Sequence, residues 1–161
     1  MSPEIILAFD YGTRRIGVAS GDTLTRTAHG LMALDCGSAM PWNAIAKLIE
    51  EYRPTQLIVG VPYNMDGTPT LLTEAARDFA RALHQRYSLP ACLIDERLSS
   101  REAEAELRHA RSTGLKRRRL THADVDMTAA KILLERWFQD PAAAESVSTS
   151  TKNRNGSGVQ T

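Results

Sequence analysis

Two short apolar segments near the start of the chain are joined by a turn that contains a glycine and two arginines. The segments Ile5–Asp10 and 16–20 have the composition of β-strands, and the connection at 12–15 is too short for a helix. We therefore expect a β-hairpin. Its first strand ends in Asp10, and a carboxylate at the end of a buried strand is costly unless something pairs with it. Asp10 is therefore either the anchor of the turn or a ligand for a cation.

After the hairpin, strand patterns alternate with helix patterns. Further strands are predicted at 27–34, Gln56–Val61 and Ala91–Asp95. Helices are predicted at 38–53, 68–87, 99–111 and 124–138, the first two with Ser38 and Thr68 as N-caps. Hairpin strands lie antiparallel, whereas strands separated by helices cross over and lie parallel. We expect an α/β fold of the RNase H-like type: a mixed five-stranded sheet, with the first strand central, flanked by helices.

The length of 161 residues favours one domain, which we place at 1–140. Residues 141–161 are rich in alanine, serine, threonine, asparagine and glycine, and such a composition predicts a disordered tail. Cys36 and Cys92 are expected to be unpaired thiols in a reducing compartment. No apolar stretch approaches the roughly 20 residues of a membrane span, and no signal-peptide pattern is present. We expect a soluble cytoplasmic protein with no membrane partner.

Three acidic residues lie at predicted element boundaries: Asp10, Glu96 and Asp126. Glu96 follows the last predicted parallel strand, at the sheet edge where open α/β sheets bind ligands. Asp126 precedes Ala129 and Ala130 by three and four residues, which places it on the apolar face of its helix. Asp124 points elsewhere and is explained as the acid of a capping box with Thr121.

Crowded carboxylates repel one another, and a divalent cation relieves the repulsion. Oxygen ligands favour Mg²⁺ or Mn²⁺ over zinc. Two such ions about 4 Å apart would hold the attacking water and the leaving oxygen of a phosphodiester in line. Taken singly, Asp10 is explained as a turn residue, Glu96 as an ion-pair partner of Arg97 and Asp126 as a helix-start residue. Their shared position at element boundaries favours a metal-dependent site.

Basic residues lie next to these carboxylates in the sequence, although the net charge of +1 predicts no global attraction to nucleic acid. The candidates for phosphate binding are Arg14, Arg15, Arg97, Lys116, Arg117, Arg118 and Arg119. Solvated loop charge explains the run 116–119 equally well, but its position before Asp126 favours the substrate. Tyr11 and Tyr63 are the only aromatic residues in the candidate site loops, so recognition of the nucleic-acid backbone is favoured over reading of bases.

Four segments in order resemble the motifs of the Holliday-junction-resolvase-like family, which is also described as a family of pre-16S ribosomal RNA nucleases. They are 10–19, 60–68, 95–99, and the basic run 116–119 followed by 126–134. The resemblance implies an RNase H-like fold, a cytoplasmic location, metal-dependent phosphodiester hydrolysis and maturation of the 5′ end of the small-subunit ribosomal RNA precursor. It places the acidic residues of the family on Asp10, Glu96 and Asp126. The spacing before Asp126 is longer than in the family pattern and includes Asp124, so both aspartates are candidates for the third ligand.

The leading hypothesis is therefore a Mg²⁺- or Mn²⁺-dependent nuclease acting on structured RNA or on branched DNA. Resolution of a four-way junction would need two active sites and hence a homodimer, whereas RNA processing is compatible with a monomer. A second hypothesis is a non-catalytic RNA-binding assembly factor. A third rests on the turn at 10–13, which also resembles the phosphate-binding turn of sugar kinases and actin-like ATPases. Those proteins need two such domains, and this chain has room for one.

Overall fold

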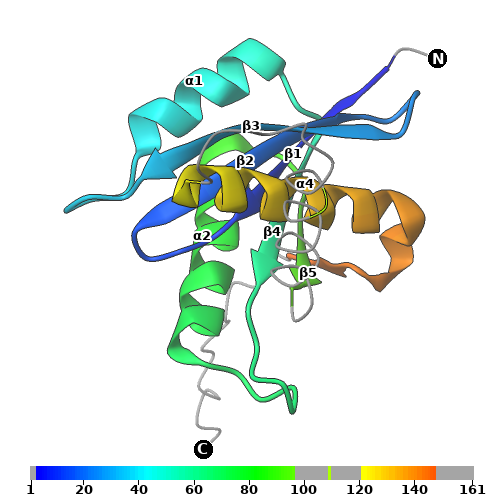
Figure 1. Cartoon of the computed structure of the whole chain (residues 1–161). Helices are drawn as coiled ribbons and strands as arrows, with labels where there is room; N and C mark the ends of the chain where they lie inside the picture. The colour runs from blue at the N-terminus through cyan, green and yellow to red at the C-terminus, as the bar shows by residue number, and fades with distance from the viewer. Residues whose placement is uncertain (1–2, 97–108, 110–120, 148–161) are drawn as a thin grey trace, which may run out of the picture.

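The computed structural model describes residues 3–96, 109 and 121–147 (Figure 1). The elements in chain order are β1 (Ile5–Asp10), β2 (Arg15–Asp22), β3 (Thr27–Asp35), α1 (Trp42–Tyr52), β4 (Gln56–Val61), α2 (Leu71–Tyr87), β5 (Ala91–Asp95), α4 (His122–Gln139), the 3₁₀ turn η1 (Pro141–Ala143) and β6 (Glu145–Ser146). The predicted helix at 99–111, apart from His109, and the basic run 116–119 lie outside the described residues.

The described strands form one mixed sheet in the order β3-β2-β1-β4-β5-β6. The hairpin pairs β1 and β2 antiparallel, and β4 and β5 run parallel to β1, as expected. The prediction of five strands was wrong by one, because β6 pairs antiparallel with β5 through Cys92 with Ser146 and Leu93 with Glu145. A two-residue strand has no periodic pattern of its own, since its pairing depends on the edge of β5.

The segment that contains β6 lies beyond the predicted domain boundary at residue 140. The 3₁₀ turn η1 turns the chain back, and the backbone amide of Val147 donates to the carbonyl of Ala91 at 2.8 Å. The side chain of Val147 packs against the main core. Ordered structure therefore continues to Val147, beyond the start of the predicted tail, and residues 148–161 lie outside the described part of the chain.

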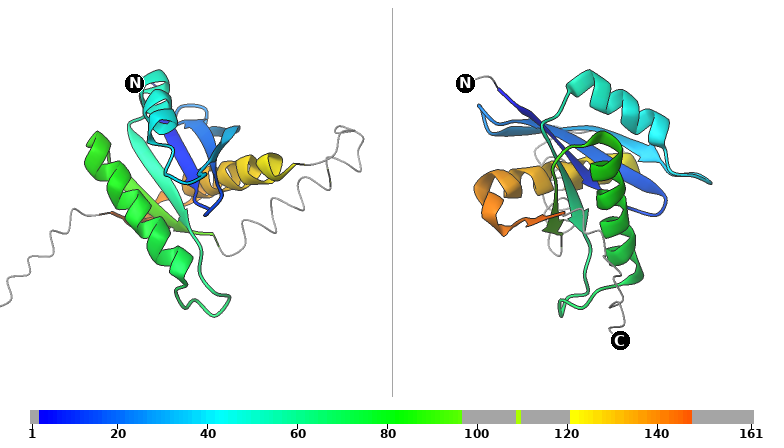
Figure 2. Two further views of the ribbon diagram at one scale, coloured as in Figure 1. Left: turned by 90° about the vertical axis from the view of Figure 1, so that its left-hand side faces the viewer. Right: turned by 180° about the vertical axis from the view of Figure 1, so that it is seen from behind.

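The sheet has two different faces (Figure 2). One face carries large side chains, among them Leu7, Phe9 and Val59, and is covered by α1 and α2. The opposite face carries smaller side chains, among them Ala8 and Ala19, and is covered by α4. Both clusters are contiguous and buried, so the two faces together form the hydrophobic core of the domain.

Small residues on the second face allow α4 to lie very close to the sheet. A Cβ atom added at Gly21 would lie 2.7 Å from Leu134 Cδ2, and one added at Gly30 would lie 3.0 Å from Met127 Cβ. Ordinary Cβ atoms do not come so close to their neighbours. The glycines of β2 and β3 therefore set the distance between α4 and the sheet.

The ends of α4 are held by specific hydrogen bonds. Thr121 caps the N-terminus in a capping box with Asp124, which confirms the predicted role of both residues. At the other end, the guanidinium of Arg26 donates to the carbonyl of Phe138. Arg26 belongs to the β2–β3 turn and has a φ of 56°. The hairpin turn thus stabilises the C-terminus of the helix that lies across the sheet.

Two other predicted caps were wrong. The N-cap of α2 is Thr70, because Thr68 donates its backbone amide and its hydroxyl to Asp66 within the preceding turn. The N-cap position of α1 is Pro41, with no side-chain cap. Cys36 and Cys92 are both buried and unpaired, as expected. Within the described ranges, no helix has the length and apolar character of a membrane span.

Candidate active site

Asp10 lies at the carboxyl end of the central strand between two glycines. In the sheet register it is opposite Gly17 of β2 and Gly60 of β4. Its side chain projects from the same face as Ile6 and Ala8, because side chains on a strand alternate. This is the face that α4 covers. The two glycines leave space on both sides of the Asp10 carboxyl group.

Glu96 uses the space above Gly60. Its backbone amide donates to the carbonyl of Val61 at 3.1 Å, which continues the β4–β5 pairing by one residue. A Cβ atom at Gly60 would lie 2.6 Å from Glu96 Oε2 and 2.5 Å from Leu133 Cδ1. The side chains of Glu96 and Asp10 are joined by a hydrogen bond. Gly60 is therefore required for the two carboxyl groups to meet.

The pKa values of Asp10 and Glu96 are both raised at the point where the two side chains are in contact. Burial raises the pKa of Asp10, and the charge of Asp126 adds to this increase, while the hydrogen bond with Glu96 opposes it. Burial, followed by the hydrogen bond and the charge of Asp10, raises the pKa of Glu96 to about 10. At neutral pH the proton therefore resides on Glu96, which donates it in the hydrogen bond to the Asp10 carboxylate.

Asp126 reaches the same region from α4. Its main chain passes so close over Gly17 that a Cβ atom there would collide with the Asp126 carbonyl oxygen. Its carboxylate accepts a hydrogen bond from Arg15 Nε at 2.8 Å. Asp124 is turned away, since its Oδ2 accepts from the amide and the hydroxyl of Thr121 at 3.0 and 2.9 Å. The structure thus brings Asp10 and Glu96 into contact and places Asp126 within electrostatic reach of Asp10.

The described residues contain no group of three histidine, cysteine, aspartate or glutamate side chains already arranged to hold a metal ion. In this structure the carboxylate of Asp126 is paired with Arg15. The donor set nevertheless fits a hard divalent cation. It consists of oxygen atoms only, and two carboxyl groups in contact repel one another once the proton leaves.

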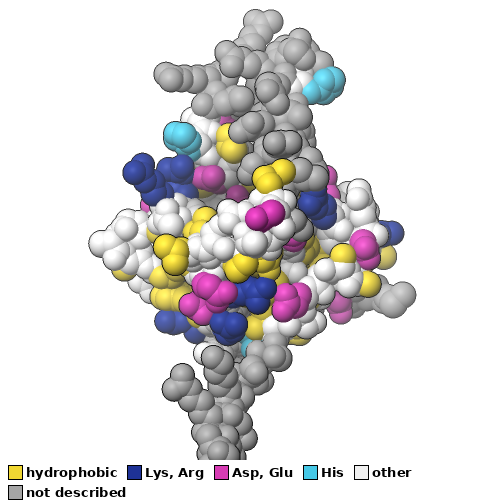
Figure 3. Space-filling view, turned by 90° about the horizontal axis from the view of Figure 1, so that it is seen from below, with side chains coloured by type: hydrophobic (Ala, Val, Ile, Leu, Met, Phe, Trp, Pro, Cys, Tyr) yellow, Lys and Arg dark blue, Asp and Glu magenta, His cyan; other side chains and the backbone are white. Residues whose placement is uncertain are grey.

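Of the predicted basic residues, only Arg14 and Arg15 belong to the described part of the chain. The Arg14 side chain is exposed at the hairpin turn, and its carbonyl accepts from the amide of Cys36. Arg97 and the residues 116–119 lie outside the described residues. Side chains of both charge signs are mixed on the visible surface of Figure 3. This agrees with the small net charge of the chain.

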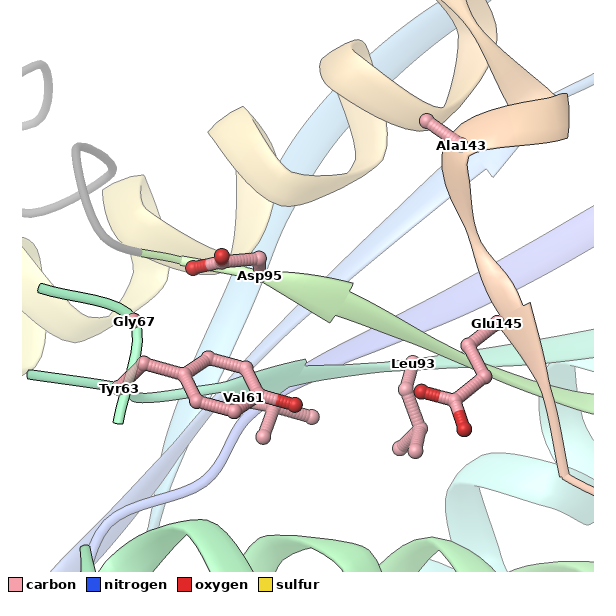
Figure 4. A pocket seen from close by; sticks show the side chains of 7 residues that line it. All are labelled: Val61, Tyr63, Gly67, Leu93, Asp95, Ala143 and Glu145. Atoms are coloured by element: carbon pink, nitrogen blue, oxygen red, sulfur yellow. The ribbon is translucent and has the colours of Figure 1, made fainter. Parts of the chain in front are cut away.

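A separate cavity of about 350 Å³ lies on the other face of β5. Figure 4 shows Tyr63, Asp95 and Glu145 around it, with Val61 and Leu93 pointing toward α2 and away from α4. The Tyr63 hydroxyl accepts a hydrogen bond from Arg77 Nη2 at 2.6 Å. This cavity is therefore distinct from the carboxyl pair, which faces α4.

Sequence reasoning missed Gly17, Gly60 and the Arg15–Asp126 ion pair. A signal for the glycines was present, because each interrupts an apolar strand segment close to a predicted strand end. No signal for the ion pair exists in the sequence, since the two residues are 111 positions apart.

The comparisons with known proteins agree on one family. Residues 4–140 match the family RuvX, described as Holliday junction resolvase. A relative from Azotobacter vinelandii, named "Putative pre-16S rRNA nuclease", is 43% identical over 143 residues, 88% of this chain and 97% of the relative. Relatives of the same name from Alcanivorax borkumensis and Coxiella burnetii are 47% and 44% identical, over 86% and 84% of this chain and 98% and 93% of their own lengths.

Among solved structures, the chain is similar to RuvC of T. thermophilus in complex with a Holliday junction substrate. The TM-score is 0.54 at 14% identity, and the match covers 89% of this chain and 99% of RuvC. A second RuvC structure from Thermus thermophilus gives a TM-score of 0.52 at 12% identity. At such low identity the likeness concerns the fold, and it supports the predicted RNase H-like architecture.

Proposed function

Because this chain belongs to the RuvX family, we propose that it is a nuclease that processes the 5′ end of pre-16S ribosomal RNA with a divalent cation, Mg²⁺ or Mn²⁺. The membership confirms the resemblance drawn from the four sequence motifs. The observation that carries the proposal is the hydrogen-bonded pair of Asp10 and Glu96 at the carboxyl end of the central strands.

The carboxyl groups and the glycines of the site would have different roles. Asp10 and Glu96 would hold the cation together, with Asp126 as the third ligand from α4. When bound, the cation would polarise the scissile phosphate and lower the pKa of a water molecule. Glu96 has to lose its proton for this binding, because a protonated carboxyl group is a poor ligand. The glycines at positions 17 and 60 keep the space around Asp10 open.

The basic residues would bind the substrate strand through its phosphates. Arg14 and Arg15 extend from the hairpin next to Asp10, and Arg97 follows Glu96 directly in the sequence. Residues 116–119 precede α4, which carries Asp126. Phosphate contacts give affinity without strong sequence preference. Such a substrate is present where ribosomes are assembled, so we place the protein in the cytoplasm.

Cleavage of a Holliday junction is the second candidate function, favoured by the description of the family as Holliday junction resolvase. Symmetric cutting of a four-way junction needs two active sites and therefore a homodimer, whereas RNA processing is also possible for a monomer. Sedimentation of the full chain with and without a four-way DNA junction separates these two candidates. A strict monomer in both conditions contradicts the junction function.

The test of the proposed function is cleavage of a 5′ fragment of pre-16S RNA in Mn²⁺ by wild type and Asp10→Asn. We expect a loss of at least about a hundredfold, because even residues that only support metal ligands contribute 10- to 100-fold. Asp35→Asn is the matched control, since Asp35 is an exposed carboxylate at the end of β3. Equal activity of Asp10→Asn and wild type contradicts the assignment. RNA binding without cleavage, unaffected by a chelator, supports the non-catalytic assembly factor instead.

A further inference from the structure

Arg15 is the partner of Asp126 across the interface between the hairpin and α4. Arg15 Nε lies 2.8 Å from Asp126 Oδ2, and the two side chains are 30% and 23% exposed. Arg15 projects from the same face of β2 as Gly17, because the two residues are two positions apart. The main chain of Asp126 lies directly over Gly17. The backbone of Asp126 is thus fixed by packing, and its carboxylate is held by Arg15.

The guanidinium of Arg15 supplies a positive charge to this group of three carboxyl groups through its contact with Asp126. The charge of Asp126 acts on Asp10, so the pairs Asp10–Glu96 and Arg15–Asp126 belong to one electrostatic cluster. A divalent cation bound to Asp126 would compete with Arg15, because both are positively charged partners of the same carboxylate.

We propose that Arg15 is a positioning residue that acts as an internal counter-ion: it holds Asp126 in the metal-free protein and turns to a substrate phosphate when a divalent cation takes Asp126. The inference rests on the proposed function. Phosphate is a suitable second partner, because a guanidinium binds phosphate and carboxylate with the same donor geometry. Arg15 would thus couple the two binding events, since the cation releases Arg15 for the substrate and the substrate releases Asp126 for the cation.

A purely structural role for Arg15 predicts different behaviour. A partly exposed ion pair contributes little to stability, so its removal should leave the protein folded. If Arg15 served only to orient Asp126, removing it would disorder a metal ligand and weaken metal binding. If Arg15 competes with the cation, removing it would strengthen metal binding in the absence of substrate. The two roles therefore predict changes of opposite sign in the same measurement.

The test is calorimetric titration of the full-length chain with Mn²⁺ in the absence of nucleic acid. We expect Arg15→Gln to bind Mn²⁺ about five- to tenfold more tightly than wild type, at the lower end of typical coupling between sites. Arg14→Gln is the matched control, because it removes the same charge from the adjacent exposed residue, for which the described structure shows no ion pair with Asp126. Arg14→Gln should bind Mn²⁺ within about twofold of wild type, since exposed charges are screened by salt.

A second measurement examines the coupling to substrate. For cleavage of the RNA fragment, Arg15→Gln should raise KM and lower the Mn²⁺ concentration at half-maximal rate, whereas Arg14→Gln should change KM alone. Arg15→Lys retains the charge and is the variant to use if Arg15→Gln does not fold. It should bind Mn²⁺ with an affinity between those of wild type and Arg15→Gln.

The outcomes separate this inference from the proposed function. Mn²⁺ binding that is equal or weaker in Arg15→Gln than in wild type overturns the inference and leaves the proposed nuclease function standing. The same change in Arg14→Gln and Arg15→Gln also overturns it, since the effect would then be long-range charge. Absence of Mn²⁺ binding in wild type and in Arg15→Gln overturns both the proposed function and the inference.

Discussion

Among the individual residues, the contact between Asp10 and Glu96 stands out because it opposes folding of the metal-free protein. Two carboxyl groups are removed from water and placed against one another, and burial raises the pKa of both. An arrangement that opposes folding is expected where a site must bind something else. The strain here is electrostatic, and a bound cation would relieve it.

The pKa of Glu96 predicts how the stability of the metal-free protein depends on pH. The folded-state pKa is raised from 4.5 to about 10. The stability associated with Glu96 is therefore fully present below about pH 4.5 and is lost progressively as the pH rises toward 10. Glutamine has no such loss and still donates a hydrogen bond to Asp10. In a chelator at pH 8, we expect Glu96→Gln to be more stable than wild type by about 1–2 kcal/mol.

Urea unfolding at pH 8 and pH 5 measures this difference, which should shrink at the lower pH. Asp35→Asn serves as the control for removal of an exposed carboxylate. Addition of Mn²⁺ should stabilise wild type more than Glu96→Gln, because the variant has lost a ligand. A variant that is less stable than wild type at pH 8 would show that the pair contributes to folding rather than opposing it.

For the secondary-structure elements, the position of α4 decides whether Asp126 reaches the site. The helix lies close to the sheet because glycines at positions 17, 21 and 30 have no side chain beneath it. The buried side chains of α4, including Ala130 and Leu134, then complete the core on this face. Helix and strands position the site together, since Asp10 comes from β1 and Asp126 from α4.

Substitution of these glycines should have graded effects. In Gly17→Ala the new methyl group meets the backbone of Asp126. Unlike a side chain, this backbone cannot change rotamer to avoid the contact. We expect a loss of about 2–3 kcal/mol, at the upper end for overpacked cores, and a strong loss of cleavage because Asp126 is displaced.

Gly30→Ala is the matched comparison, because its methyl group meets the Cβ of Met127 at 3.0 Å rather than the backbone of Asp126. It should cost about 1 kcal/mol and retain most of the cleavage. Thermal unfolding and single-turnover cleavage of both variants test whether Gly17→Ala loses more stability and more activity than Gly30→Ala. Equal losses of activity would contradict the view that Asp126 is placed by its contact with Gly17.

For the molecule as a whole, the C-terminal segment closes one edge of the sheet. Without β6, the backbone groups of β5 from Ala91 to Leu93 would lose their partners. An open strand edge is also a template for association with another chain. The segment 141–147 is therefore part of the folded domain and protects the strand that leads to Glu96.

Truncation after Asp140 should destabilise the protein by about 1–2 kcal/mol relative to truncation after Val147, in the range of ordinary losses of local packing and hydrogen bonds. The variant ending at Val147 is the matched control, because it retains β6 and the contact of Val147 with the core. Denaturant unfolding gives the difference, and light scattering should detect more association in the shorter variant. Equal stability of the two variants would show that β6 contributes nothing measurable.

Local sequence patterns were sufficient to predict the strands of the hairpin, the two parallel strands and the capping box of Thr121 and Asp124. Each of these depends on neighbouring residues, whose periodicity and hydrogen-bonding groups are visible in the sequence. The same holds for Asp10, Glu96 and Asp126 as candidates, because each lies at a boundary between elements. Their joint role as metal ligands stays a prediction.

Contacts between residues that are distant in the chain are determined only by the tertiary structure. The hydrogen bond between Asp10 and Glu96, the ion pair of Arg15 with Asp126 and the pairing of β6 with β5 all join segments brought together by the sheet. A sequence pattern reports the preferences of a segment, whereas these contacts depend on strand order and on the distance of α4 from the sheet. That distance is set by glycines, whose effect appears only when another element lies above them.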